Sequence, residues 1–132
     1  MLLTKECDYG VRIIRALADG TKKTVKAICE EEHVPHKYAY KILKKMQKAG
    51  LVKNRLGPNG GYLRSKPLED FSLYDIVSAV DERVFLSECL RGDNDCPRNT
   101  SDEPCKVHHE LNRLQALLVA EMKAKSITEI FE

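Results

Sequence analysis

Residues 35–64 read PHKYAYKILKKMQKAGLVKNRLGPNGGYLR, a strongly patterned segment followed by a run rich in glycine. When residues 36–49 are placed on a helix at about 100° per residue, apolar side chains gather on one side and lysines on the other. One face can therefore pack on a core while the opposite face presents ammonium groups to solvent. The apolar set is Ala39, Ile42, Leu43 and Met46, and the basic set is Lys37, Lys41, Lys44, Lys45 and Lys48.

A β-hairpin is expected directly after this helix. Two short strand-like segments, residues 51–56 and 62–64, flank Gly57-Pro58-Asn59-Gly60-Gly61, and the Asn-Gly pair within that run is a hairpin signal. Lys53 and Arg55 lie on the first segment and Arg64 on the second. The expected ribbon is therefore basic, and it directly follows a basic helix.

Further helices are predicted on both sides of this region from apolar periodicity and from residues that start or stop helices. Their approximate ranges are 4–19, a short helix after residue 24, 72–80 and 107–125, with a terminal turn after residue 126. The expected boundary residues are Gly20, Thr24, Pro35 in the first turn of the lysine-rich helix, Gly50, the capping box Ser72-Leu73-Tyr74-Asp75, and Ser126.

Three helices followed by a hairpin is the order of elements in a winged helix-turn-helix. We therefore expect a mainly α fold with a small β-hairpin, to which a long C-terminal helix is added. The expected division is a winged helix-turn-helix DNA-binding domain at residues 1–80, a cysteine-containing loop at 81–106, and a dimerisation helix with its tail at 107–132.

The charge distribution favours a polyanionic partner. The formal net charge of +2 combines a net of +9 over residues 1–66 with a net of −7 over residues 67–132. Duplex DNA carries one phosphate charge per roughly 1.7 Å of axis, so a lysine stripe is a suitable electrostatic partner for it. The alternatives are a solvated amphipathic helix or two oppositely charged halves that attract each other. The residues expected to contact DNA are Lys37, Tyr38, Tyr40, Lys41, Lys44, Lys45, Lys53, Arg55 and Asn59.

Composition excludes several other classes of protein. The chain has 132 residues, with 42% hydrophobic and 32% charged, which is ordinary globular usage and argues against a disordered or fibrous protein. No run approaches the roughly 20 apolar residues of a membrane span, and residues 1–6 lack the apolar core of a signal peptide. A cytoplasmic location is expected. The glycine run lacks the Gly-Lys-Ser/Thr ending of a phosphate-binding loop, which argues against a nucleotidase.

The acidic half contains a candidate metal or cluster site. Cys89, Cys96, Cys105 and His108 are spaced as C-x6-C-x8-C-x2-H in a segment without helical or strand periodicity. Thiolates brought together in such a loop are the ligands that iron–sulfur clusters and zinc use. The alternatives are idle thiols or a reversible disulfide. Of the remaining cysteines, Cys29 is expected in the core, and the role of Cys7 stays open.

An enzymatic role is not expected. Cys105 with His108 or His109 could form a thiol–imidazole pair, but no third orienting group or substrate pocket is evident from the sequence.

The C-terminal helix is expected to mediate a homodimer. Its apolar stripe must be buried somewhere, and a two-fold related copy buries both stripes at once. The alternative is packing onto the first helix of the same chain. The stripe consists of Leu111, Leu114, Leu117, Leu118 and Met122.

Several segments together resemble a known family. They are Leu3-Thr4 with Asp8-Tyr9-Gly10, Gly57-Pro58-Asn59-Gly60-Gly61-Tyr62-Leu63, Ile76-Val77-Ser78-Ala79-Val80-Asp81, and the cysteine loop before a final helix. In this combination the chain resembles, over essentially its whole length, the IscR/NsrR regulators of the Rrf-type-two superfamily of winged-helix transcription factors.

The resemblance implies a homodimeric regulator that binds double-stranded operator DNA and senses iron–sulfur status, redox state or nitric oxide. By similarity, Cys89, Cys96 and Cys105 would hold an iron–sulfur cluster, with 2Fe–2S favoured and 4Fe–4S as the alternative. The fourth ligand would be His108, as in IscR-like proteins, or Asp8, as in NsrR-like proteins, where it ligates the partner's cluster.

This sequence departs from the family pattern in two places. The gaps between the cysteines are wider than is usual, and Tyr40 stands where IscR-like proteins carry a glutamate that discriminates between DNA sites. Some family members lack the cluster. A cluster-free or zinc-stabilised winged-helix regulator, or a protein-interaction module, therefore remains the alternative.

Overall fold

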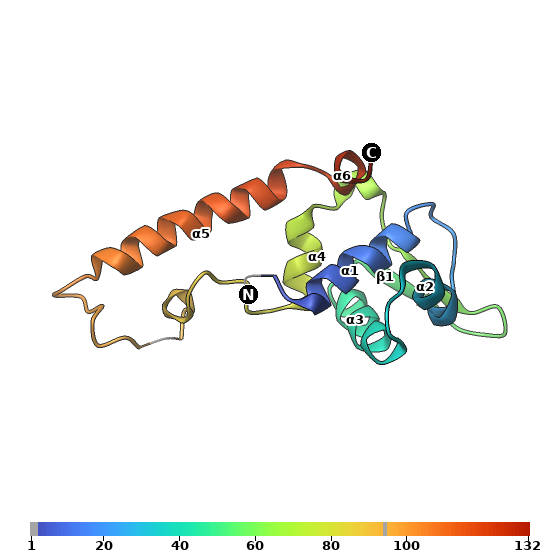
Figure 1. Ribbon diagram of the computed structural model, residues 1–132, viewed down its shortest axis with the longest axis horizontal. Coiled ribbons are helices and arrows are strands. Elements are labelled where there is room, and N and C mark those ends of the chain that lie inside the picture. The colour runs from blue at the N-terminus through green and yellow to red at the C-terminus, as the bar shows by residue number, and fades with distance from the viewer. Residues whose placement is uncertain (1–2, 94) are drawn as a thin grey trace.

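The computed structural model describes residues 3–93 and 95–132. Residues 1, 2 and 94, which fall in the expected DNA-binding domain and cysteine loop, lie outside the described part. A helical body carries a two-stranded hairpin, while the cysteine loop and a long helix project together to one side (Figure 1). The elements are α1 (Lys5–Ala16), α2 (Val25–Glu32), α3 (His36–Lys48), β1 (Val52–Arg55), β2 (Gly61–Arg64), η1 (Leu68–Asp70), α4 (Leu73–Val80), η2 (Glu88–Leu90), α5 (Lys106–Ala124) and α6 (Ile127–Phe131).

Side-chain caps fix the starts of most helices, largely as the sequence predicts. Thr24 accepts a hydrogen bond from the Ala27 N–H at 3.1 Å, and both Ser72 and Ser126 form complete capping boxes. These caps satisfy backbone N–H groups that have no partner inside the helix. Pro35 differs slightly from expectation, because it is the N-cap residue of α3 and precedes the first turn.

The core lies between α1, α3 and α4, and α1 contacts both of the other helices. Ile13 of α1, Ile42 of α3 and Ile76 of α4 have no exposed surface. The helices approach closely at Gly10, where a Cβ atom would lie 2.8 Å from Cγ2 of Val80. A glycine at this position therefore sets the distance between α1 and α4.

The hairpin forms as expected, but its turn differs from the predicted Asn-Gly turn. The antiparallel register pairs Val52 with Arg64 and Arg55 with Gly61. The tight turn runs from Gly57 to Gly60, whose backbone N–H donates to the Gly57 carbonyl at 2.9 Å. Pro58 and Asn59 therefore occupy the centre of the turn, where proline's fixed φ suits the second position.

Two contacts attach the hairpin to the helical body. Lys23, just before α2, exchanges two backbone hydrogen bonds with Tyr62 at 2.9 and 2.8 Å. A Cβ atom on the neighbouring Gly61 would lie 2.5 Å from the Lys23 carbonyl oxygen, so this approach requires glycine. Arg64 donates to the carbonyl of Ala18 at 3.3 Å, which directs it inward and away from the surface of the hairpin.

After α4 the chain leaves the body through residues 81–105 and returns along α5. Gln115 of α5 holds the start of this loop, since it accepts from the Leu86 N–H at 2.9 Å and donates to the Val84 carbonyl at 2.8 Å. At the other end, Ile127 of α6 is fully buried and its N–H donates to the Phe71 carbonyl. Within residues 3–93 and 95–132, no helix is long and apolar enough to cross a membrane.

We predict that Gly10→Ala destabilises the fold by about 1–3 kcal/mol, because the added methyl group meets a β-branched side chain with little rotamer freedom. Chemical unfolding in urea measures this change. Gly92→Ala is the matched control, since no atom of the described residues lies within 4 Å of a Cβ atom there, and its stability should stay within about 0.5 kcal/mol of the wild type. Equal stability of the two variants would contradict the close packing of α1 on α4.

Candidate nucleic-acid interface and cysteine loop

The amphipathic pattern predicted for α3 is confirmed. Its apolar residues Ala39, Ile42, Leu43 and Met46 have no exposed surface. Because they fix the rotation of the helix, the opposite side faces solvent. Lys37, Lys41, Lys44 and Lys48 are exposed there, and so is Tyr40.

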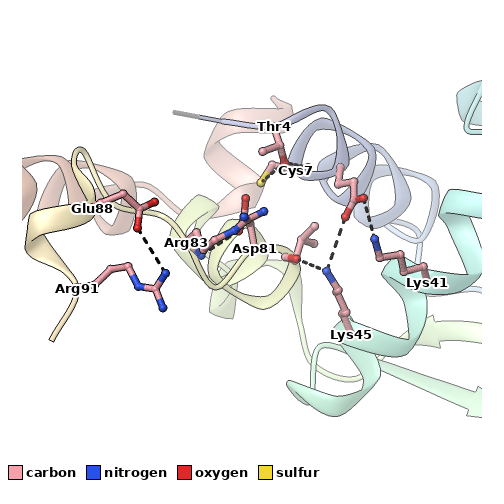
Figure 2. Close-up of polar contacts among 10 residues, drawn as sticks. Thr4, Cys7, Lys41, Lys45, Asp81, Arg83, Glu88 and Arg91 are labelled. Carbon is pink, nitrogen blue, oxygen red and sulfur yellow. Dashed lines mark hydrogen bonds and ion pairs between the residues drawn. The ribbon is translucent and has the colours of Figure 1, made fainter. Parts of the chain in front are cut away.

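Two of the predicted DNA-contacting lysines are already engaged by the rest of the protein. Lys41 Nζ lies 3.0 Å from Glu6 Oε1, and Lys45 Nζ lies 3.7 Å from Glu6 Oε2. Lys45 also donates a hydrogen bond of 2.9 Å to the carbonyl oxygen of Val80 at the end of α4. Figure 2 shows both lysines directed from α3 toward the start of α1. The sequence pattern places these lysines on the exposed face but does not reveal the partners.

The two tyrosines that flank the lysines lie in different surroundings. Tyr38 is partly buried, with its ring centroid 5.5 Å from that of Tyr9 on α1. Lys37 covers the same ring, with Nζ 5.1 Å from the centroid. Tyr40 is 51% exposed, and its ring centroid lies 6.3 Å from that of His36. Tyr40 is therefore free to contact a ligand, whereas Tyr38 mainly joins α3 to α1.

A groove of about 400 Å³ separates the start of α3 from the hairpin. Its lining includes His36 and Tyr40 from α3 and Asn54 and Arg55 from β1. His36 and Asn54 are not among the residues that the sequence analysis expects to contact DNA. His36 could have been found, because it lies four residues before Tyr40 and therefore on the same face of the helix. The groove thus brings together aromatic, amide and cationic side chains from α2, α3 and the hairpin.

The hairpin residues expected to contact DNA are all exposed. Lys53 and Arg55 lie on β1, and Asn59 lies at the tip beside Leu56, which is 88% exposed. Such a tip can approach a second surface without rearrangement of the core.

In the cysteine loop, the three thiols lie at partly exposed positions. Cys105 is the N-cap residue of α5, where its sulfur accepts from the His108 N–H at 3.5 Å. Its own N–H donates to Asn99 Oδ1 at 2.9 Å, and the Asn99 N–H donates to the Cys96 carbonyl at 2.9 Å. Cys89 Sγ lies 3.3 Å from Ser87 Oγ. Local hydrogen bonds thus order the segment between the second and third cysteines.

The structure does not bring these thiols together. Within residues 3–93 and 95–132, no group of three His, Cys, Asp or Glu side chains is placed to hold a metal ion. Nδ1 of His108 is buried and has no hydrogen-bond partner among the described residues, so it is a polar atom that could act as a metal ligand. Asp8, the other candidate, is 3.1 Å from the guanidinium of Arg12. The three sulfurs and one imidazole nitrogen match the donor types of an iron–sulfur or zinc site, provided that the loop rearranges.

The remaining cysteines have different surroundings. Cys29 is buried on α2, as predicted, and burial raises the pKa of its thiol, with a smaller contribution from Glu30. Cys7 is also buried, and the Thr4 hydroxyl donates to its sulfur at 3.4 Å. Both thiols therefore belong to the core of the helical body.

The apolar stripe of α5 is only partly covered. Met122 is buried against the body, and α5 contacts α4 and η2. Leu114 and Leu117 remain 39% and 51% exposed, and Val107 is 66% exposed. Large apolar side chains in a row on one helix are typical of a surface that associates with a partner.

Comparison with known sequences gives a consistent family assignment. Residues 3–132 match the family model Rrf2, described as an iron-dependent transcriptional regulator. A Haemophilus influenzae HTH-type transcriptional regulator is 34% identical over 97 residues, which are 71% of this chain and 65% of that protein. IscR of Vibrio atlanticus is 31% identical over 82% of this chain and 62% of its own length. The chain thus spans somewhat less than two thirds of these relatives.

Solved structures show the same fold. IscR of T. potens superposes with a TM-score of 0.71 at 19% identity, covering 98% of this chain and 85% of that one. CymR, the global cysteine regulator of B. subtilis, superposes with a TM-score of 0.74 at 18% identity, covering 97% and 94% of the two chains. The winged-helix architecture and the family match agree with the resemblance seen in the sequence, and the relatives are named as transcriptional regulators, which is a non-enzymatic role. The chain is a member of the Rrf2 family of transcriptional regulators.

Proposed function

We propose that the chain regulates transcription by inserting α3 into the major groove of duplex DNA while the hairpin contacts the adjacent backbone. The observation that carries this proposal is the exposed basic face of α3 beside a hairpin that exposes Lys53 and Arg55. Phosphate contacts from lysine and arginine supply affinity and position, and contacts to base edges supply specificity.

Exposure and position suggest a role for each candidate residue except Lys41, which pairs with Glu6. Lys37, Lys44 and Arg55 are assigned to phosphates, because their charges face solvent on α3 and β1. Tyr40 is assigned to base edges or a thymine methyl group, since it is the exposed tyrosine on α3 and lies in the groove. Asn59 and Lys53 on the hairpin are assigned to the neighbouring backbone or minor groove. Tyr38 packs on α1 and Lys45 binds Val80, so both hold α3 in place, and the partly exposed Lys45 can meet a phosphate only in competition with Glu6.

The proposed DNA-binding form is a homodimer whose two chains associate through α5. The exposed Leu114 and Leu117 support this arrangement, because a second copy would cover both. A two-fold dimer would present two α3 helices to half-sites about 34–36 Å apart on one face of the duplex. Small changes in the separation of the two helices would then change affinity.

We further propose that Cys89, Cys96 and Cys105 hold an iron–sulfur cluster, with 2Fe–2S favoured over 4Fe–4S. His108 is the better candidate for the fourth ligand, because its Nδ1 is buried and meets no hydrogen-bond partner in residues 3–93 and 95–132, whereas Asp8 pairs with Arg12. When bound, such a group supplies chemistry that responds to oxidation and nitric oxide. The chain's own part is to fold residues 81–105 around it, and this loop begins next to α4, which packs on α1 and α3.

The DNA interface is tested by removing single charges. Lys44→Ala and Arg55→Ala should each weaken binding to duplex DNA and reduce the slope of log affinity against log salt by about 0.9, the value of one lost phosphate contact. Fluorescence anisotropy over a salt series measures both quantities. Lys125→Ala removes an equal charge from an exposed position between α5 and α6, away from α3 (Figure 1), and should change neither. Equal slopes for all three variants would contradict the assignment.

The cluster is tested by composition. Protein purified without oxygen should be coloured and contain iron and acid-labile sulfide, and the combined Cys89→Ala, Cys96→Ala and Cys105→Ala variant should contain neither. Cys29→Ala is the matched control and should retain both, because Cys29 lies in the core. His108→Ala should alter the visible spectrum if His108 is the fourth ligand, and Asp8→Ala tests the alternative. Zinc without iron or sulfide would identify a zinc-stabilised regulator instead.

A further inference from the structure

The carboxylate of Glu6 on α1 contacts the basic face of α3. Glu6, in the first turn of α1, lies within ion-pair distance of both Lys41 and Lys45. Its side chain is 26% exposed, whereas that of Lys41 is 56% exposed. The contact links residues 35 positions apart in the sequence. The two ion pairs with Glu6 are drawn in Figure 2 as the dashed lines that run from Lys41 and Lys45 toward the start of α1.

The contact divides the lysines of α3 into two groups. Lys37, Lys44 and Lys48 make no ion pair with the carboxylates of residues 3–93 and 95–132, so their charges are available to phosphates. Lys41 and Lys45 already have a carboxylate partner. A phosphate that approaches either of them must compete with Glu6.

We infer that Glu6 restrains non-specific DNA binding by occupying Lys41 and Lys45 in the free protein. This inference rests on the proposed use of α3 as a DNA-binding helix. Non-specific DNA binding depends almost entirely on phosphate contacts. Its affinity therefore falls more than that of specific binding when Lys41 and Lys45 are paired with Glu6. Lys41 lies at the surface and can exchange the carboxylate for a phosphate once α3 is fully seated in the groove. Glu6 therefore acts as a specificity-determining residue without touching DNA itself.

The carboxylate also has a structural alternative. A negative side chain in the first turn of a helix interacts favourably with the helix dipole, and Glu6 could serve that purpose alone. The two roles differ in their readout, because a dipole interaction affects stability but leaves the salt dependence of DNA binding unchanged. Surface ion pairs contribute little to stability, so the variant without this carboxylate is expected to stay folded.

The test uses the full chain and a mixed-sequence duplex of about 30 base pairs, long enough for two successive major grooves. Glu6→Gln should bind this duplex roughly two- to fivefold more tightly at about 0.1 M salt, with a slope against log salt steeper by about 1. Anisotropy titrations measure both, and circular dichroism verifies folding. Glu110→Gln is the matched control, since it removes the same charge from an exposed pair with Arg113 on α5, and it should bind like the wild type.

A double-mutant cycle separates the possible failures. In a background carrying Lys41→Gln and Lys45→Gln, Glu6→Gln should have no further effect on DNA binding. If Glu6→Gln binds like the wild type while Lys44→Ala still weakens binding, the role of Glu6 is wrong and the DNA interface stands. If Lys44→Ala has no effect either, the proposed interface fails and the role of Glu6 fails with it. An undiminished effect of Glu6→Gln in the double-lysine background also overturns the inference.

Should Glu6→Gln unfold, Glu6→Asp is the second variant. It keeps the charge at the start of α1 but shortens the side chain, and it should show part of the same increase in DNA affinity.

Discussion

The packing of α3 on α1 and α4 is the constraint on which the remaining structure depends. Ala39, Ile42, Leu43 and Met46 have no exposed surface, so the rotation of the helix is not adjustable. A shift of one residue would turn the helix by about 100° and carry lysines into the core, where unpaired charge is very costly. The outward direction of the basic face is therefore a consequence of apolar burial on the opposite side.

Polar contacts add to the apolar packing that holds α3 against α1 and α4. Lys45 binds the carbonyl oxygen of Val80, the last residue of α4, and shares Glu6 with Lys41. Asp81 follows Val80 directly, and Arg83 lies 3.7 Å from Asp81 at the start of the cysteine loop (Figure 2). The cysteine loop thus begins at Asp81, one residue after Val80, whose carbonyl oxygen binds Lys45 of the proposed DNA-binding helix α3. This short connection is the structural basis for expecting the two sites to influence each other.

Local signals in the sequence were sufficient for most of the fold. Thr24, Ser72 and Ser126 cap helices where the sequence predicts, because capping depends on residues within one turn. The hairpin was also predictable, although the centre of its turn was not. The sequence does not predict that Tyr38 is partly buried while Tyr40 is exposed, or that Lys41 pairs with Glu6. These features depend on contacts between segments far apart in the chain. The cysteine spacing indicates a ligand set, but ligands gathered by a bound group need not be gathered without it.

In the proposed complex, α3 enters the major groove of the duplex, twice per dimer. Methylation interference at guanine N7, an atom that faces the major groove, tests it most directly when the duplex is one selected by the full chain from a random-sequence library. For this mode of binding, two clusters of interfering guanines are expected about 10 base pairs apart on one face of the duplex. Binding that is indifferent to guanine N7 methylation, or sensitive only to changes in the minor groove, would contradict it.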